Sequence, residues 1–78
     1  MAETVTLADA LPAQIKRVQA KRERWLEYQR LAGPQAMFGP GLALMQAEIN
    51  EGVAALASGD VSRMIRAHEA LAANSDDD

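Results

Sequence analysis

The sequence predicts an all-α protein, in which an antiparallel helical hairpin carries a shorter third helix packed across it, as in a three-helix bundle. Apolar residues recur every three or four positions through three segments, and no segment shows the alternation typical of strands. Short glycine-containing stretches lie between the segments and mark the positions where one helix ends and the next begins. We expect one domain over residues 11–73, after a lead-in over 1–10 in which Thr6 and Asp9 cap a short turn, and before a disordered acidic tail over 74–78.

The first helix is expected over residues 11–32. Pro12 has no amide hydrogen to donate and therefore fits the first turn of a helix, which places the start near Leu11. Gly33 and Pro34 end the helix, because glycine adopts the left-handed closing conformation and proline cannot continue the hydrogen-bond ladder. The apolar residues of this segment share one arc of the helix: Leu11, Ile15, Val18, Trp25, Leu26 and Ala32.

The second helix is expected over residues 34–58, with a kink at Gly39–Gly41. Its apolar positions keep one helical phase across this Gly-Pro-Gly segment: Phe38, Leu42, Met45, Ile49, Gly52, Val53 and Leu56. A proline inside a helix costs about 3 kcal/mol, which argues against continuity. The alternative is therefore a helix that starts afresh at Pro40. We prefer the kink because Phe38 is in phase with the residues that follow it.

The third helix is expected over residues 60–73, with Gly59 closing the preceding helix and Asp60 accepting amide hydrogen bonds from the first turn. Its apolar stripe comprises Val61, Met64, Ile65, His68, Leu71 and Ala72. His68 is the only histidine and has no orienting partner for base catalysis, so we expect it to be half-buried and hydrogen-bonded at a helix contact. Without a cysteine or a second histidine, no metal site, cofactor or catalytic residue is predicted, and the protein is not expected to be an enzyme.

The formal net charge of −3 hides an uneven distribution. Residues 11–32 hold six basic and two acidic residues, a net charge of +4, whereas the rest of the chain holds two basic and nine acidic residues, a net charge of −7. Hydrophobic residues make up 49% of the chain, but only one Trp, one Tyr and one Phe are among them. The core is therefore expected to be thin, and we expect a homodimer or higher oligomer because self-association adds burial.

One group of residues on the first helix forms the candidate protein interface: Arg22, Arg24, Trp25, Tyr28 and Gln29. Arg22 lies within the apolar arc, where a charge is costly unless it is paired. It therefore either forms an ion pair with Glu48 or Glu51 on the second helix or faces a partner. Trp25 also has two interpretations. It is either the largest core residue or an interface residue, because aromatic and arginine side chains are enriched at protein interfaces.

The basic run "KRVQAKRERW" makes a nucleic-acid-binding accessory protein the alternative function. Phosphate binding needs several basic side chains that converge on one face. Here the basic residues lie on two flanks of the helix with Glu23 and Glu27 among them, so a solvated amphipathic face is the preferred interpretation. The chain has no signal-like start and no run approaching about 18 apolar residues, so we expect a cytoplasmic protein without a membrane partner.

Three stretches, "LPAQIKRV", "GPQAMFGPGLALMQAEI" and "ALASGDVSRMIRAHEAL", resemble small uncharacterised helical proteins encoded by Mu-like phages and prophages. The resemblance covers about residues 11–73 and transfers no functional residue. It implies a phage or prophage context and an accessory protein that binds and modulates a host or phage protein. We therefore expect a non-catalytic protein-interaction module with an unidentified protein partner, in the host cytoplasm if it is phage-encoded.

Overall fold

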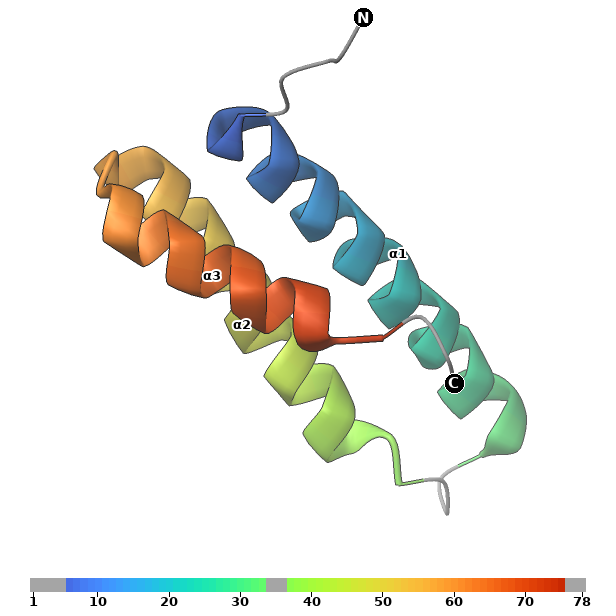
Figure 1. Ribbon diagram of the computed structural model, residues 1–78. Helices are drawn as coiled ribbons and strands as arrows, with labels where there is room; N and C mark the ends of the chain where they lie inside the picture. The colour runs from blue at the N-terminus through green and yellow to red at the C-terminus, as the bar shows by residue number, and fades with distance from the viewer. Residues whose placement is uncertain (1–5, 34–36, 76–78) are drawn as a thin grey trace, which may run out of the picture.

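The computed structural model describes residues 6–33 and 37–75, and over these residues the chain is helical, without a strand (Figure 1). The helices are α1 (Leu7–Ala32), α2 (Gly39–Ser58) and α3 (Val61–Ala73). α2 runs back along α1 to form a hairpin, and α3 packs against both of them. The predicted all-α hairpin with a shorter third helix is confirmed. What the sequence predicts for residues 1–5, 34–36 and 76–78 lies outside the described part of the chain.

The start of α1 lies at Leu7, so the predicted start near Leu11 is wrong. Thr6 is the N-cap: its side-chain oxygen accepts a hydrogen bond from the Asp9 amide at 3.3 Å and donates its own hydrogen to the Asp9 carboxylate at 2.9 Å. This cap satisfies amide groups that the first turn leaves unpaired, and the earlier start also packs Leu7 against the core. Together they outweigh the hydrogen bond that Pro12 cannot make inside the helix.

The start of α2 lies at Gly39, so the predicted helix over 34–58 with an internal kink is also wrong. Pro40 occupies the first turn, where its missing amide hydrogen has no partner to lose. Phe38 lies just outside the helix, yet its ring meets the ring of Trp25 edge-on, with centroids 5.6 Å apart and an angle of 71° between planes. The apolar phase of Phe38 therefore reflects packing against the core and not a continuous helix.

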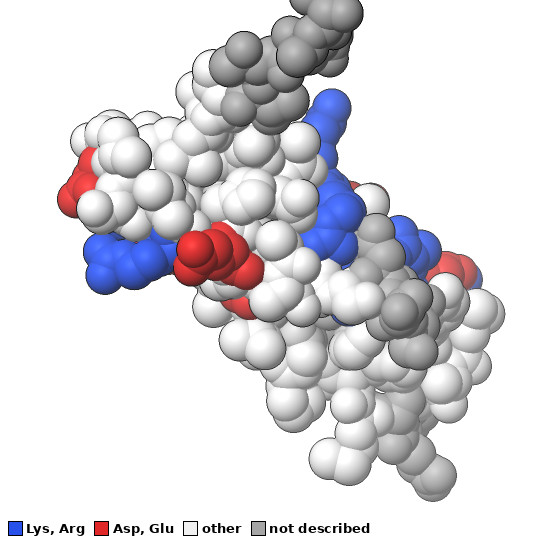
Figure 2. Space-filling model, viewed as in Figure 1, with Lys and Arg blue, Asp and Glu red and all other residues white. Residues whose placement is uncertain are grey.

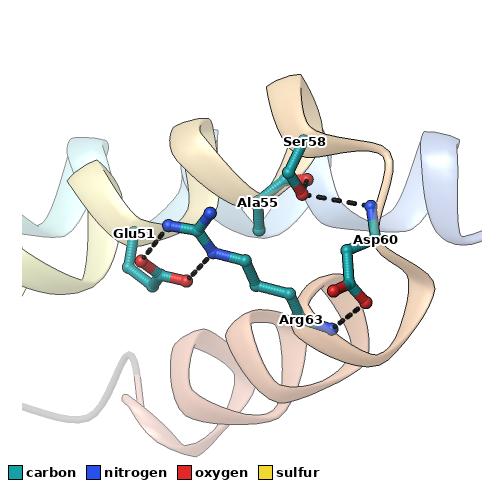
Figure 3. Close-up of polar contacts among 5 residues, drawn as sticks. All are labelled: Glu51, Ala55, Ser58, Asp60 and Arg63. Atoms are coloured by element: carbon teal, nitrogen blue, oxygen red, sulfur yellow. Dashed lines mark hydrogen bonds and ion pairs between the residues drawn. The ribbon is translucent and has the colours of Figure 1, made fainter.

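The turn between α2 and α3 is fixed by side-chain hydrogen bonds to the backbone (Figure 3). Gly59 adopts the left-handed conformation, with φ 70° and ψ 5°, which closes α2. The Ser58 hydroxyl donates to the Ala55 carbonyl at 2.7 Å and accepts from the Asp60 amide at 3.1 Å. The Asp60 carboxylate then accepts from the Arg63 amide at 3.2 Å, which confirms the predicted cap.

An ion pair joins the two helices beside this turn (Figure 3). The Arg63 guanidinium donates to both carboxylate oxygens of Glu51, at 2.7 and 2.9 Å. The hydrogen bonds from Arg63 lower the pKa of Glu51 below its ordinary value. The pair therefore stabilises the fold at neutral pH, and this contribution is lost as the pH falls through the lowered pKa. Both groups are exposed to solvent, so the contribution is small and falls with added salt.

The core of the bundle is aliphatic. Its buried members are Leu11, Ile15, Val18, Leu42, Met45, Ile49, Ala55, Met64, Ala67 and Leu71. The three helices pack closely around Gly52, where an added Cβ would lie 3.0 Å from Ile15 and 3.1 Å from Leu71. Trp25 and Phe38 pack only against the edge of this core. The thin core predicted from the composition is therefore present, and its aromatic residues lie toward one end of the hairpin.

Replacing Asp60 with alanine should lower the free energy of unfolding by about 0.5–2 kcal/mol, because the Arg63 amide loses its acceptor. Urea denaturation measures this loss. Asp60→Asn is the control and should retain most of the stability, since an asparagine oxygen also caps helices. Equal losses in the two variants would contradict a capping role.

Candidate functional site

Two cationic side chains of α1 hold the C-terminal end of α3. The Arg17 guanidinium donates to the Leu71 carbonyl at 2.7 Å. The Lys21 ammonium donates to the side-chain oxygen of Asn74 at 2.7 Å and to the Ser75 carbonyl. The last carbonyls of a helix carry partial negative charge, so Arg17 stabilises one of them directly, and Lys21 binds the two residues that follow α3. Asn74 and Ser75 belong to the tail that the sequence predicts to be disordered, and that part of the prediction is wrong.

Lys21 is the buried charge of the bundle, with only 5% of its surface exposed. Its ammonium nitrogen lies 5.3 Å from the centroid of the Trp25 ring, within range of a cation–π interaction. Asn74, which accepts from Lys21, also donates to the Glu48 carboxylate at 2.9 Å. The ammonium, the amide and the carboxylate therefore form one network that joins all three helices, and the lysine hydrogens are directed to two oxygens and a ring face.

A groove of about 300 Å³ opens beside this network, where α3 ends. It is lined by Lys21, Trp25, Gly41, Leu44, Met45, Glu48, Ala70, Ala73, Asn74 and Ser75. The indole of Trp25 lies directly over Gly41: a Cβ added there would lie 2.5 Å from its Cζ3 atom. The groove thus has an apolar floor, and its polar edge consists of groups that already bind one another.

The hairpin extends well beyond the end of α3 (Figure 1). α1 and α2 contain 26 and 20 residues, but α3 contains only 13. At 1.5 Å per residue these helices are about 39, 30 and 20 Å long. Because Asn74 is bonded to Lys21 and Glu48, the part of α1 after Lys21 and the part of α2 before Glu48 have no α3 beside them. Half of this face of the hairpin is therefore not covered by α3.

Large apolar side chains are exposed on this uncovered half. Tyr28 follows Lys21 by seven residues and Leu44 precedes Glu48 by four, so both share the helix faces that contact α3. Tyr28 is 39% exposed, Leu31 71% and Leu44 60%. We call Trp25, Tyr28, Leu31, Gly41 and Leu44 the hairpin-end surface. Met37, which is 88% exposed, lies in the connection at the same end of the hairpin.

The part of α2 in this surface carries no charge. Residues 39–47 contain no Asp, Glu, Lys or Arg. In the space-filling view, the region over the start of α2, at the lower edge of the molecule, is accordingly white (Figure 2). A helix that faces water normally has charged or polar side chains on its outer side. The start of α2 is therefore an exposed helical segment without charged side chains.

The ion pair predicted for Arg22 does not form. Glu48 accepts a hydrogen bond from Asn74, and Glu51 pairs with α3 instead. The Nε atom of Arg22 is buried and has no hydrogen-bond partner among the described residues. The buried, fully bonded cation is the preceding residue, Lys21. The buried face of α1 is wider than its apolar residues predict, because α1 contacts both α2 and α3. Lys21 lies outside the predicted apolar arc, on the side of α1 that packs against α3.

The other candidate interface residues are distributed over the core edge and the surface. Trp25 is partly buried against the core and also lines the groove, and its role at an interface stays a prediction. Tyr28 and Arg24 are exposed, and Gln29 is half-buried. His68 is half-buried on α3, away from the groove lining. The sequence reasoning missed Gly41 and Leu44, although the absence of charge over residues 39–47 was a visible signal for them.

Residues 6–33 and 37–75 include no cluster of three His, Cys, Asp or Glu side chains that could hold a metal ion. No described helix has the length and apolar character needed to cross a membrane. Comparisons with protein-family models, curated proteins and solved structures find no match to this chain. The fold and groove therefore define a small three-helix protein whose hairpin is longer than the helix that covers it.

Replacing Gly41 with alanine should displace Trp25, because the new Cβ would overlap the indole. We expect a loss of about 1–3 kcal/mol in the free energy of unfolding, as for other overpacked sites. The emission of this single tryptophan should also shift. Gly39→Ala is the matched control: no heavy atom lies within 4 Å of its added Cβ, so stability should be unchanged or higher. Identical behaviour of the two variants would refute the indole contact.

Replacing Lys21 with methionine keeps the apolar stem but removes the ammonium. Two partly buried oxygens near the end of α3 then lose their donor, and we expect a loss of about 1–3 kcal/mol on urea denaturation. Lys16→Met, on the exposed side of the same helix, should change stability by no more than about 0.5 kcal/mol. A Lys21 variant as stable as the Lys16 variant would show that the network does not hold α3.

Proposed function

We propose that this chain is a non-catalytic protein-interaction module that binds a protein partner through the hairpin-end surface. The observation that supports this proposal is the uncovered half of the hairpin, where exposed Leu44 lines an apolar groove and Tyr28 and Leu31 are also exposed. Burying a large aliphatic side chain completely contributes about 1.5–3 kcal/mol. A partner that covers two or three such residues would gain several kcal/mol toward binding.

The chemistry of the groove favours a protein partner over a small polar substrate. Its polar groups, Lys21, Glu48 and Asn74, already bind one another, so they offer few free donors or acceptors to a ligand. A volume of about 300 Å³ is at the lower limit for ligand pockets and suits one or two protruding side chains. The groove lining also lacks a cysteine, serine nucleophile–base pair or histidine with which to start a reaction.

Nucleic-acid binding through α1 is the weaker candidate. Arg17 and Lys21 bind the end of α3, and Arg30 pairs with Glu27 on its own helix. At least half of the six basic residues of α1 are therefore engaged within the protein. Phosphate binding would require several of them to converge on one accessible face, and these intramolecular contacts work against that.

The resemblance to Mu-like phage and prophage proteins gives the proposal a context. An accessory protein of this kind would bind a host or phage protein in the host cytoplasm and modulate it by covering or bridging one of its surfaces. The hairpin-end surface suits this mode, because an apolar patch with little charge can dock on a partner helix or hydrophobic groove.

Affinity capture from an extract of the native host tests the proposal. Leu44→Glu places a charge in the hairpin-end surface and should reduce capture of the partner, identified by mass spectrometry, at least tenfold. Val53→Glu is the matched control, since Val53 is similarly exposed on the same helix (53% against 60%) and lies outside that surface. Equal capture by both variants, or a DNA or RNA gel shift at low salt that needs the α1 basic residues, would contradict the proposal.

A further inference from the structure

We infer that one partner of the hairpin-end surface is a second copy of this chain, bound antiparallel so that the uncovered halves of the two hairpins overlap. The inference rests on the proposed function and names a partner for the same surface. It draws on three properties of that surface: the place where α3 ends, the charge on the opposed helices and the area available. Each restricts what can cover the surface.

The position of α3 determines the orientation of the second copy. α3 lies on the same face as the hairpin-end surface and ends opposite Lys21 and Glu48. If two hairpins stacked on this face in the same direction, their α3 helices would collide and keep the uncovered halves apart. If they stack in opposite directions, each uncovered half, about 16 Å long over residues 22–32, lies against the other, and each α3 stays beyond the partner's hairpin end. Only the antiparallel arrangement closes the contact.

The charges on the opposed segments permit this self-contact. The protein as a whole carries a net charge of −3, which would oppose association through most of its surface. Residues 39–47 of α2 have no charge, and residues 22–32 of α1 have three basic and two acidic residues, a net charge of +1. The two segments that would meet, with net charges of 0 and +1, therefore bring little like charge together.

The area of the surface sets the strength of the dimer. The uncovered parts of α1 and α2, each about 10 Å wide and about 16 and 14 Å long, give a footprint of about 300 Å² per copy. Stable specific interfaces bury about 600 Å² or more per partner. This surface therefore supports a weak, reversible dimer with a dissociation constant between about 1 µM and 1 mM. Such a dimer leaves the same surface accessible to a stronger partner at low concentration.

Analytical ultracentrifugation of the full chain between about 1 µM and 1 mM tests the inference. We expect the mass to rise from the 8.4 kDa monomer toward a dimer and no further, because a two-fold contact closes on itself. Leu44→Glu should raise the dissociation constant at least tenfold, and Val53→Glu should leave it within twofold. A strict monomer, a larger assembly, or equal effects of the two substitutions would overturn the inference.

Backbone NMR spectra of the wild-type chain over the same concentrations place the contact without a substitution. Amide signals of Tyr28, Leu31 and Leu44 should shift with concentration, whereas those of Val53 and Ile65 should not. Shifts centred on Val53 or Ile65 would overturn the inference even if a dimer forms. If the chain stays monomeric but Leu44→Glu still loses a captured host protein, the self-contact is refuted and the proposed function stands. If both tests fail, both are refuted.

Discussion

The buried ammonium of Lys21 is the constraint on which the rest of this structure depends. A charge in a protein interior costs several kcal/mol unless it is paired. Here an asparagine oxygen, a backbone carbonyl and the face of Trp25 surround it, and the first two belong to the residues that end α3. The lysine is therefore satisfied only if α3 stops opposite it. Arg17 reinforces the same end point through the Leu71 carbonyl. One cation thus determines both the packing of three helices and the length of the last one.

The end of α3 at Lys21 also divides the hairpin into a part whose polar groups stabilise the fold and a part whose apolar side chains are exposed. The polar residues around Lys21 bind one another across three helices and so leave little hydrogen-bonding capacity at the groove edge. Beyond them the hairpin continues without α3, and its apolar side chains stay in contact with water. Stability therefore comes from the aliphatic core, the polar network and the Trp25 indole, and the exposed side chains of Leu31 and Leu44 contribute little to it. A partner can cover Leu44 or Leu31 without disturbing the bundle.

Local chemistry predicted part of this structure, and tertiary contacts decided the rest. The glycine closure before α3 and the Asp60 cap follow from adjacent residues alone, and both are present. The predicted start of α1 is wrong because a proline such as Pro12 is typical of a first helical turn. The Thr6 cap and the packing of the first turn outweigh the hydrogen bond that Pro12 cannot make. Lys21 could not be identified from apolar periodicity. A helical wheel assumes one buried arc, and α1 has two neighbours whose positions depend on the whole fold.

The Gly-Pro-Gly segment shows why the surface was also hard to predict. Its residue types are typical of a helix boundary, and Pro40 does lie in the first turn of a helix. Gly41, however, has a further role, because its lack of a side chain lets the Trp25 indole lie against the backbone and form the groove floor. From there to Glu48 the helix has no charged residue, although Leu44 is exposed. Solvated helix faces carry charges, and buried faces do not. An exposed face with the composition of a buried one is the observation on which the proposed partner binding rests.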